Sequence, residues 1–299
     1  MKDEYIRFDW AMKRLLRQKA NFGVLEGFLT VLLGEQVRIV EILESESNQE
    51  SADDKFNRVD IKARNNKDEI MIVEIQNARE LYYMERILYG VSKAIAEHIH
   101  LGDSYGEIKK VYSISILYFD IGEGNDYLYH GQTKFIGVHT GDSLMVTDRQ
   151  RSALVPQPTE TIFPEYYIIR VDEFNKVAVT PLEEWTRYLK TGEIPADATA
   201  PGLPEAREKM CYYHMTQEEQ NAYRRHLNDV MIDKGVAERF RLELEMEREK
   251  YRKAKEETAQ IRDALRQTVL NMLQRGIPIE DITTITGLSS TDIVPYLSN

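Results

Sequence analysis

The chain has 299 residues, of which 42% are hydrophobic and 30% are charged, and it carries a formal net charge of −11. This length fits one good-sized domain with an accessory region, or two small domains, and the apolar content suffices for a buried core. The negative charge argues against a protein that coats nucleic acid through bulk electrostatics, but it allows an enzyme that contacts nucleic acid locally and binds divalent cations.

Other features of the sequence bear on the compartment. Cys211 is the single cysteine, which excludes an internal disulfide and any zinc site built from clustered cysteines. The first 16 residues lack the apolar run of a signal peptide. No segment approaches the roughly 18 consecutive apolar residues that a membrane-spanning helix needs. We therefore expect a cytoplasmic protein without a membrane anchor.

The first half of the chain follows the order helix, strand, hairpin, helix, strand. This order favours an α/β core with a mixed sheet. Neither a GxGxxG nor a GxxxxGK[ST] motif occurs, so the sequence does not predict a dinucleotide site or a P-loop. The most apolar strand, residues 110–121, is expected near the centre of the sheet. The expected elements are a broken helix over 3–33, a strand over 36–45, a hairpin over 57–76, a helix over 78–100 and the strand over 110–121.

The second half is predicted to complete the sheet and then to become helical. Two strands are expected over 127–140 and 165–174, separated by the proline-containing stretch 153–164. A helix is expected over 181–191, with Pro181 at its start, because proline suits the first turn of a helix. The residues after position 235 fit either a solitary solvated helix or a weak coiled coil, and the second would allow a homo-oligomer to form through the C-terminal helices. The predicted organisation is an α/β domain over 1–195, a linker over 196–204 and a helical region over 205–299, with the coiled-coil helix over 235–272 and a small helical tail.

The hairpin NRVDIKARNNKDEIMIVEIQ, residues 57–76, carries the most informative polar residues. Side chains alternate across a strand, so Asp60 on the first arm and Glu74 and Gln76 on the second can share one face. Two close carboxylates repel each other unless a positive charge lies between them. Oxygen ligands of this kind suit Mg²⁺, and the backbone carbonyl of Ile75 is a natural third ligand. Gln76 can orient a water molecule or a phosphate through its amide, although it cannot act as a base or a cation.

The same pattern also has a simpler explanation. Alternating charged and apolar residues are typical of any half-exposed antiparallel pair, in which Asp60, Glu74 and Gln76 would merely face solvent. Glu74 favours the metal site, because it interrupts the apolar run IMIVEI, and charges are rarely buried unless they are paired or bound to metal.

Four stretches of the sequence together resemble the Rpn family of recombination-promoting nucleases, also described as PD-(D/E)XK nuclease family transposases. The stretches are FDWAMKRLL, VDIKARNNKDEIMIVEIQ, YYMERILYGVSKA and GDSYGEIKKVYSISIL, and the similarity extends over roughly residues 5–195. The resemblance implies a restriction-endonuclease-like core, with helices flanking a mixed sheet, that cleaves DNA with Mg²⁺, for which Mn²⁺ could substitute.

The resemblance also implies roles for residues of the hairpin. Asp60 and Glu74 match the two acids of the family motif, which bind metal. Gln76 stands where the wider superfamily has lysine, and the resembling family itself often has glutamine there. The replacement leaves open how well a hydroxide would be stabilised, and therefore how fast any cleavage would be.

Further residues match the pattern of that family. Asp9 and Lys13 lie on the first helix and Arg86 on the helix after the hairpin. Lys13 could supply the missing lysine charge, or it could pair with Asp9 four residues earlier. Arg86 could bind a phosphate or one of the acids, or it could remain exposed. Lys62 is expected on the face of the acids, in a structural ion pair.

Two aromatic residues and the C-terminal tail are further candidates for contact with nucleic acid. Tyr82 and Tyr89 lie along one face of the helix over 78–100, and we expect them at the edge of the core rather than as a platform for stacked bases. The tail after Pro278 has the spacing of a degenerate helix-turn-helix with Gly287 at the turn. Because it contains no arginine or lysine, we expect it to pack or oligomerise rather than to read DNA.

Two functions are compatible with these features. The first is a Mg²⁺-dependent endodeoxyribonuclease, a DNA-binding hydrolase of phosphodiester bonds, with a role in DNA recombination or mobile-element biology. The second is a catalytically inactive protein of the same fold that binds nucleic acid or protein. Metal binding that fails when Asp60 or Glu74 is substituted would favour the first.

Overall fold

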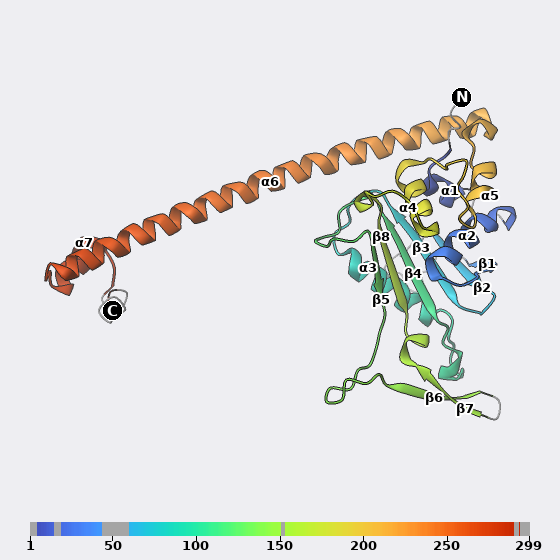
Figure 1. Cartoon of the computed structure of the whole chain (residues 1–299), viewed down its shortest axis with the longest axis horizontal. Helices are drawn as coiled ribbons and strands as arrows, with labels where there is room; N and C mark the ends of the chain where they lie inside the picture. The colour runs from blue at the N-terminus through green and yellow to red at the C-terminus, as the bar shows by residue number, and fades with distance from the viewer. Residues whose placement is uncertain (1–4, 15–18, 44–59, 151–152, 290–292, 294–299) are drawn as a thin grey trace. The chain divides into compact units, whose positions relative to one another are not determined.

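The computed structural model covers the whole chain and describes residues 5–14, 19–43, 60–150, 153–289 and 293. Six strands form its main sheet: β1 (Ile39–Leu43), β2 (Ile61–Asn65), β3 (Ile70–Gln76), β4 (Val111–Leu117), β5 (Leu128–Gly131) and β8 (Glu165–Arg170). They lie in the order β1-β2-β3-β4-β8-β5 (Figure 1). The pairs β3–β4 and β4–β8 are parallel and the other three pairs are antiparallel. The predicted α/β class with a mixed sheet is confirmed, and the apolar strand β4 is central.

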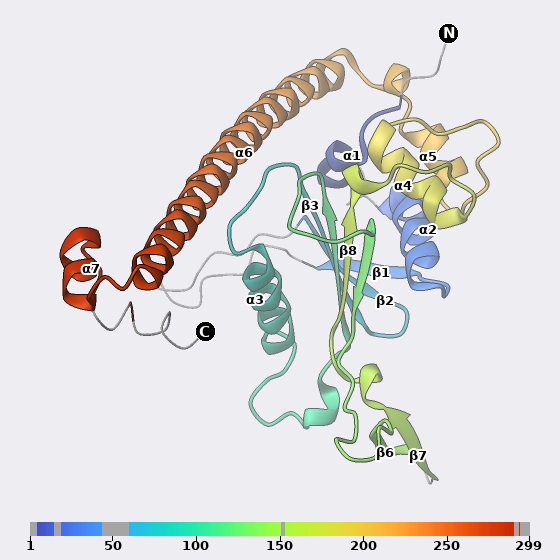
Figure 2. The same cartoon turned by 60° about the vertical axis from the view of Figure 1, so that its left-hand side comes forward.

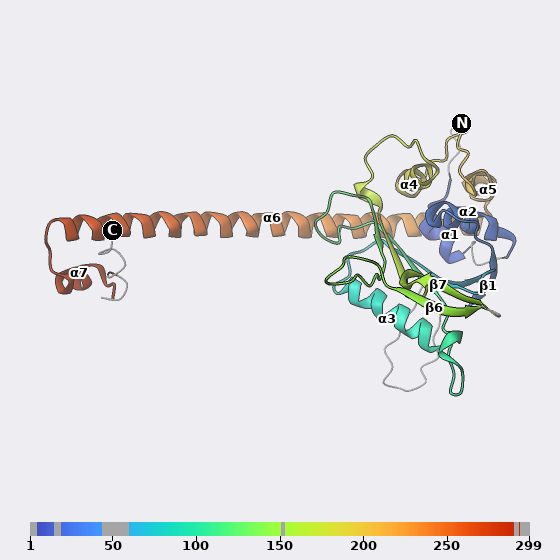
Figure 3. The ribbon, with the colours of Figure 1, turned by 60° about the horizontal axis from the view of Figure 1, so that its bottom comes forward.

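Helix α3 (Tyr83–Ala96) covers one face of this sheet (Figures 2 and 3). Its buried stripe packs against Ile70 and Ile72 of β3. Since side chains alternate along a strand, Glu74 and Gln76 point to the same side of the sheet as these two isoleucines. The functional candidates of β3 therefore lie on the side of α3.

Four helices cover the opposite face: α1 (Phe8–Arg14), α2 (Phe22–Leu33), α4 (Pro181–Thr191) and α5 (Leu203–Lys209) (Figures 2 and 3). Phe8, Phe28 and Trp185 bring three of these helices together, with ring centroids 5.3–5.7 Å apart. Such tilted contacts are favoured between aromatic rings. These rings and the odd-numbered residues of β3 belong to the main buried core.

Helix α4 has the bounds that the sequence predicts, Pro181–Thr191. Thr180 caps its N-terminus, because its side chain accepts a hydrogen bond from the backbone of Glu183 while the Glu183 side chain accepts one from the backbone of Thr180. Gly192 ends the helix in the left-handed conformation that glycine adopts readily.

Helix α3 is shorter than the predicted helix over 78–100. It begins at Tyr83, because Tyr82 has a left-handed backbone with φ 61° that breaks the helical path. It ends at Ala96, four residues before the predicted end at residue 100. The expectation that Tyr82 lies at the edge of the core is wrong, since 77% of this residue is exposed.

A second, two-stranded sheet lies between β5 and β8 along the chain, formed by β6 (Met145–Gln150) and β7 (Ala153–Pro158) (Figure 1). The sequence predicts a loop over 153–164, because it contains two prolines in the part that becomes β7. A two-stranded sheet tolerates them, since each strand has one edge that needs no ladder hydrogen bond. The predicted strand over 127–140 is reduced to β5.

The C-terminal region is helical, as predicted, with α6 (Gln217–Gln274) and α7 (Ile279–Thr286). The chain divides into two compact units, Met1–Lys234 and Gly235–Asn299. In the second unit a small core gathers around Val269, Ile282 and Ile293. The last helix of the suggested helix-turn-helix falls largely outside the described residues. No described helix is apolar enough over sufficient length to cross a membrane.

The segment predicted as a linker, 196–204, is packed against the main core. Ala198, Ala200 and Leu203 are buried there. The division between the compact units falls between Lys234 and Gly235 instead. That the α/β domain ends near residue 195 stays a prediction.

Candidate active site

The two arms of the hairpin place two carboxylates opposite each other. Strands β2 and β3 are antiparallel, with Ile61 opposite Val73. Extending this register by one residue places Asp60, which lies just before β2, opposite Glu74. Burial raises the pKa of Glu74 and the charge of Asp60 adds to this shift, so the two carboxylates lie close to each other. Glu74 lies on the side of the sheet that α3 covers, and Asp60 is its neighbour at the start of β2.

Asp60 is held by the backbone of β3. Its Oδ2 accepts a hydrogen bond from the N–H of Ile75 at 2.6 Å. The carbonyl of Gln76 accepts the N–H of Tyr118 at 2.9 Å, on the side of β4. Because successive carbonyls of a strand point to opposite sides, the carbonyl of Ile75 is directed toward the side of β2, where Asp60 lies.

Glu74 is buried, with 4% of the residue exposed. Nη2 of Arg86 donates a hydrogen bond to its Oε1 at 3.4 Å, and the hydroxyl of Tyr83 lies 3.4 Å from its Oε2. Burial raises the pKa of Glu74 above its ordinary value; the charge of Arg86 opposes this shift, and the nearby charge of Asp60 adds to it. The charged carboxylate is therefore incompletely compensated by its protein neighbours.

Tyr83 and Ser115 complete the polar environment of Glu74, and the sequence analysis did not identify them. The Tyr83 hydroxyl lies 3.0 Å from Oγ of Ser115, which is opposite Glu74 in the parallel pair β3–β4. Burial and the charge of Glu74 raise the pKa of Tyr83 well above its ordinary value, so this hydroxyl stays protonated. The signal that could have found this group is the polar Ser113 and Ser115 at alternate positions of the apolar strand VYSISIL.

Arg86 links the acid of β3 to the loop before α3. Besides Glu74, it pairs with Glu80. Of the alternatives that the sequence left open, the structure therefore has Arg86 bound to one of the acids. Gln76, at the end of β3, is half-buried.

The part of the chain that contains both acids matches a known protein family. Residues 6–154 match the model of a family described as PD-(D/E)XK nuclease family transposase. The chain belongs to this family. The match contains the hairpin with both acids and ends before β8, so it is shorter than the resemblance over roughly 5–195. Among curated proteins and solved structures, no match to the chain was found.

Membership of the PD-(D/E)XK nuclease transposases implies a nuclease that acts on DNA and uses divalent metal ions. The carboxylates of Asp60 and Glu74 and the carbonyl of Ile75 are oxygen donors of the kind such ions prefer. In the described part of the chain, no three His, Cys, Asp or Glu side chains are grouped to hold a metal. Two carboxylates nevertheless fit Mg²⁺, which is commonly bound by one or two of them and keeps several water ligands.

Asp9, the candidate acid of the first helix, lies in a separate polar cluster. Its oxygens accept hydrogen bonds from Arg7 at 3.1 Å, from Asn77 at 2.9 Å and from Nε2 of His226 at 3.0 Å. Burial alone would raise the pKa of Asp9, but the hydrogen bond of His226 and the charge of Arg7 lower it well below its usual range. Lys13 lies in α1, and its side chain falls outside the described part of the structure.

Lys62 lies on the face of the two acids, as predicted, but it pairs with another residue. Its Nζ lies 2.5 Å from Oε2 of Glu97, just after α3. The lysine is 7% exposed. This ion pair ties the hairpin to α3, which is the structural role expected from the sequence.

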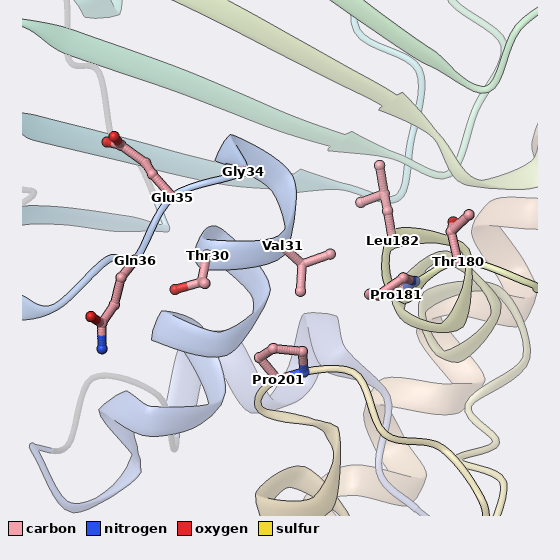
Figure 4. A pocket seen from close by; sticks show the side chains of 9 residues that line it. All are labelled: Thr30, Val31, Gly34, Glu35, Gln36, Thr180, Pro181, Leu182 and Pro201. Atoms are coloured by element: carbon pink, nitrogen blue, oxygen red, sulfur yellow. The ribbon is translucent and has the colours of Figure 1, made fainter.

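A shallow pocket of about 380 Å³ lies elsewhere in the nuclease, between the end of α2 and the start of α4 (Figure 4). Its lining consists of Thr30, Val31, Gly34, Glu35, Gln36, Thr180, Pro181, Leu182 and Pro201. None of the candidate site residues belongs to it. Glu74 lies instead on the α3 side of the sheet, so this pocket and the candidate site are distinct.

Proposed function

We propose that this PD-(D/E)XK nuclease transposase is a metal-dependent DNA endonuclease that hydrolyses phosphodiester bonds. The observation that supports it is the closeness of Asp60 and Glu74 across the hairpin, with Glu74 buried. Two carboxylates so placed repel each other, and a cation between them would relieve the repulsion. Mg²⁺ is the ion we propose, with Mn²⁺ as a substitute, and the family description favours a role in mobile-element biology or recombination.

Each residue of the site has a task in this proposal. Asp60, Glu74 and the carbonyl of Ile75 hold the ion. When bound, the ion would polarise the phosphodiester and lower the pKa of a coordinated water. Gln76 orients the attacking water or a phosphate oxygen through its amide. Arg86 keeps Glu74 in place and adds positive charge beside the phosphate.

Nicking and linearisation of supercoiled plasmid tests the proposal. We expect cleavage with Mg²⁺ or Mn²⁺, none with EDTA, and none with Asp60→Asn or Glu74→Gln. Glu107→Gln, at an exposed acid outside the site, serves as the control and should cleave like the wild type. Unchanged cleavage in both site variants would place the activity elsewhere. Inactive wild-type protein would favour the nucleic-acid- or protein-binding alternative.

We further propose that the protein self-associates through α6. Phe240, Leu244, Tyr251 and Ile261 are 45–73% exposed. They are 4, 7 and 10 residues apart, which are sums of the alternating steps of three and four that form the seam of a coiled coil, with Glu247 at one of the positions between them. A second copy of the helix would remove these apolar side chains from water.

A further inference from the structure

The junction between β3 and α3 exposes a large aromatic side chain beside the candidate active site. Leu81 and Tyr82 are 74% and 77% exposed. The next residue, Tyr83, is buried, with its hydroxyl 3.4 Å from Glu74 and 3.0 Å from Ser115. Consecutive Cα atoms are about 3.8 Å apart. The exposed ring of Tyr82 therefore belongs to the residue next to the one whose hydroxyl lies beside Glu74.

The backbone of Tyr82 has an uncommon conformation. Its φ of 61° and ψ of 33° lie in the left-handed region, which bulky side chains rarely adopt. Among the described residues other than glycine, Asp68 alone shares a positive φ, and aspartate is a common residue there. The carbonyl of Tyr82 accepts the N–H of Arg86 at 3.0 Å, so the first turn of α3 fixes this conformation. A bulky side chain on such a backbone, next to a residue of the candidate site, points to a role for that side chain.

Two arginines lie near the exposed ring in the sequence, along with Glu80 and Glu85. Arg79 is exposed on the same loop, and Arg86 lies one turn into α3, where it pairs with the acid of β3. Arginine side chains contact phosphates, and tyrosine rings stack on bases. Leu81 adds an apolar edge next to the ring. This combination suits a nucleotide, which offers both a phosphate and a flat aromatic base.

We infer that Tyr82 stacks on an unpaired base of the DNA substrate, next to the phosphate that the acids engage. The inference rests on the function proposed for the same site and names its substrate class: DNA with unpaired bases near the cut, such as a single strand, a frayed end or a mismatch. In an intact duplex the bases stack on one another and present only their edges in the grooves. A tyrosine ring therefore has no exposed base face on which to stack.

DNA binding in EDTA at low ionic strength tests this inference without cleavage. Fluorescence anisotropy would compare a labelled single strand with the matching blunt duplex. We expect Tyr82→Ala to weaken single-strand binding by roughly 5- to 150-fold, the equivalent of about 1–3 kcal/mol, and to leave duplex binding unchanged. Tyr82→Phe, which keeps the ring, should bind like the wild type. Tyr105→Ala, at a tyrosine that is 86% exposed outside this junction, is the matched control and should change neither affinity.

A second variant separates stacking from folding. Tyr82→Gly removes the ring and relieves the positive φ, so it should unfold at no lower temperature than the wild type and still lose single-strand affinity. A base analogue such as 2-aminopurine in the bound strand should be quenched by the wild type and less so by either variant. Wild-type affinity for single strands in Tyr82→Ala would overturn the inference. An equal loss for single strands and duplex, or no DNA binding by the wild type, would overturn it too.

The outcomes separate this inference from the proposed nuclease activity. If the wild type cleaves DNA with metal and Tyr82→Ala binds single strands normally, the inference fails and the nuclease stands. If the wild type binds single strands through Tyr82 but cleaves no DNA with Mg²⁺ or Mn²⁺, the nuclease proposal fails and the stacking surface stands.

Discussion

At the scale of single residues, Glu74 determines the electrostatics of the site. Its carboxylate is buried beside Asp60, and one arginine compensates it from 3.4 Å. Burial of a carboxylate stabilises a fold only where its charge is well paired. The buried charge of Glu74 therefore lowers the stability of the metal-free protein, as expected for a side chain that binds a ligand.

We predict that Glu74→Gln stabilises the protein in EDTA at neutral pH. The folded state raises the pKa of Glu74, so it favours the protonated carboxyl, and the charged form lowers stability above that pKa. This penalty disappears as the pH falls through the raised pKa. Urea denaturation should therefore show the variant above the wild type at neutral pH, with a difference that shrinks in acid. A variant that is less stable than the wild type by the same amount at every pH would contradict this prediction.

The sequence predicts the acid pair but not its surroundings. Alternation along a hairpin suffices to place Asp60 and Glu74 on one face, because strand register is a local property. Tyr83 and Ser115 reach Glu74 through the parallel pairing of β3 with β4 and the packing of α3. The alternating serines of β4 mark a polar group, but the contacts join separate segments of the chain, so the sequence does not show that this group lies beside Glu74. The strained backbone of Tyr82 is likewise a consequence of where α3 must begin.

At the scale of elements, the cluster around Asp9 ties three segments together. Asp9 in α1 binds Arg7, the loop residue Asn77 and His226 at the start of α6. Asp9 is fully buried, whereas Arg7 and His226 are partly exposed. Removing one member of a buried charged cluster leaves the others without compensation.

We predict that Asp9→Ala destabilises the protein by about 3 kcal/mol or more at neutral pH. Because the fold lowers the pKa of Asp9, its contribution is present above the ordinary aspartate pKa and is lost as the pH falls through the lowered value. Urea denaturation should show the difference between variant and wild type shrinking in strong acid. Glu257→Ala, at an exposed position of α6, is the control and should leave stability unchanged. A loss no larger than that of the control would show that the cluster does not hold these segments.

Elements differ in how far the sequence predicts them. The start of helix α4 was predicted from Pro181, and the structure adds Thr180 and Gly192 as the residues that cap its two ends. The start of α3 carries no such marker, and the prediction placed it five residues early. The sequence did not predict the β6–β7 pair, because the prolines of β7 usually indicate a loop. A strand at the edge of a sheet nevertheless accepts proline.

At the scale of the whole molecule, α6 is the element that would bring copies together. It is described as one helix of 58 residues, and charged side chains dominate its sequence. Exposed apolar residues along it, including Phe240 and Ile261, lie on the predicted seam. Coiled coils of this composition are weak, so we expect an association that depends on protein concentration.

We predict that the pair of changes Phe240→Glu and Ile261→Glu shifts the protein from oligomer to monomer. Two charges at seam positions would oppose burial of that face. Analytical ultracentrifugation over a range of concentrations would measure this shift. Val138→Glu, at a residue that is 92% exposed outside α6, is the control and should keep the wild-type mass. A wild type that stays monomeric at every concentration would contradict self-association.

The most direct measurement is single-turnover cleavage of DNA as a function of Mg²⁺ concentration, using a labelled strand that carries unpaired bases. The wild type and Glu107→Gln should cleave with the same rate and the same saturating dependence on Mg²⁺. Asp60→Asn and Glu74→Gln should each lose at least about 100-fold in rate, because each removes a ligand charge from the site. Cleavage that needs no metal, or that proceeds at the wild-type rate in both variants, would contradict a metal-dependent nuclease built on this hairpin.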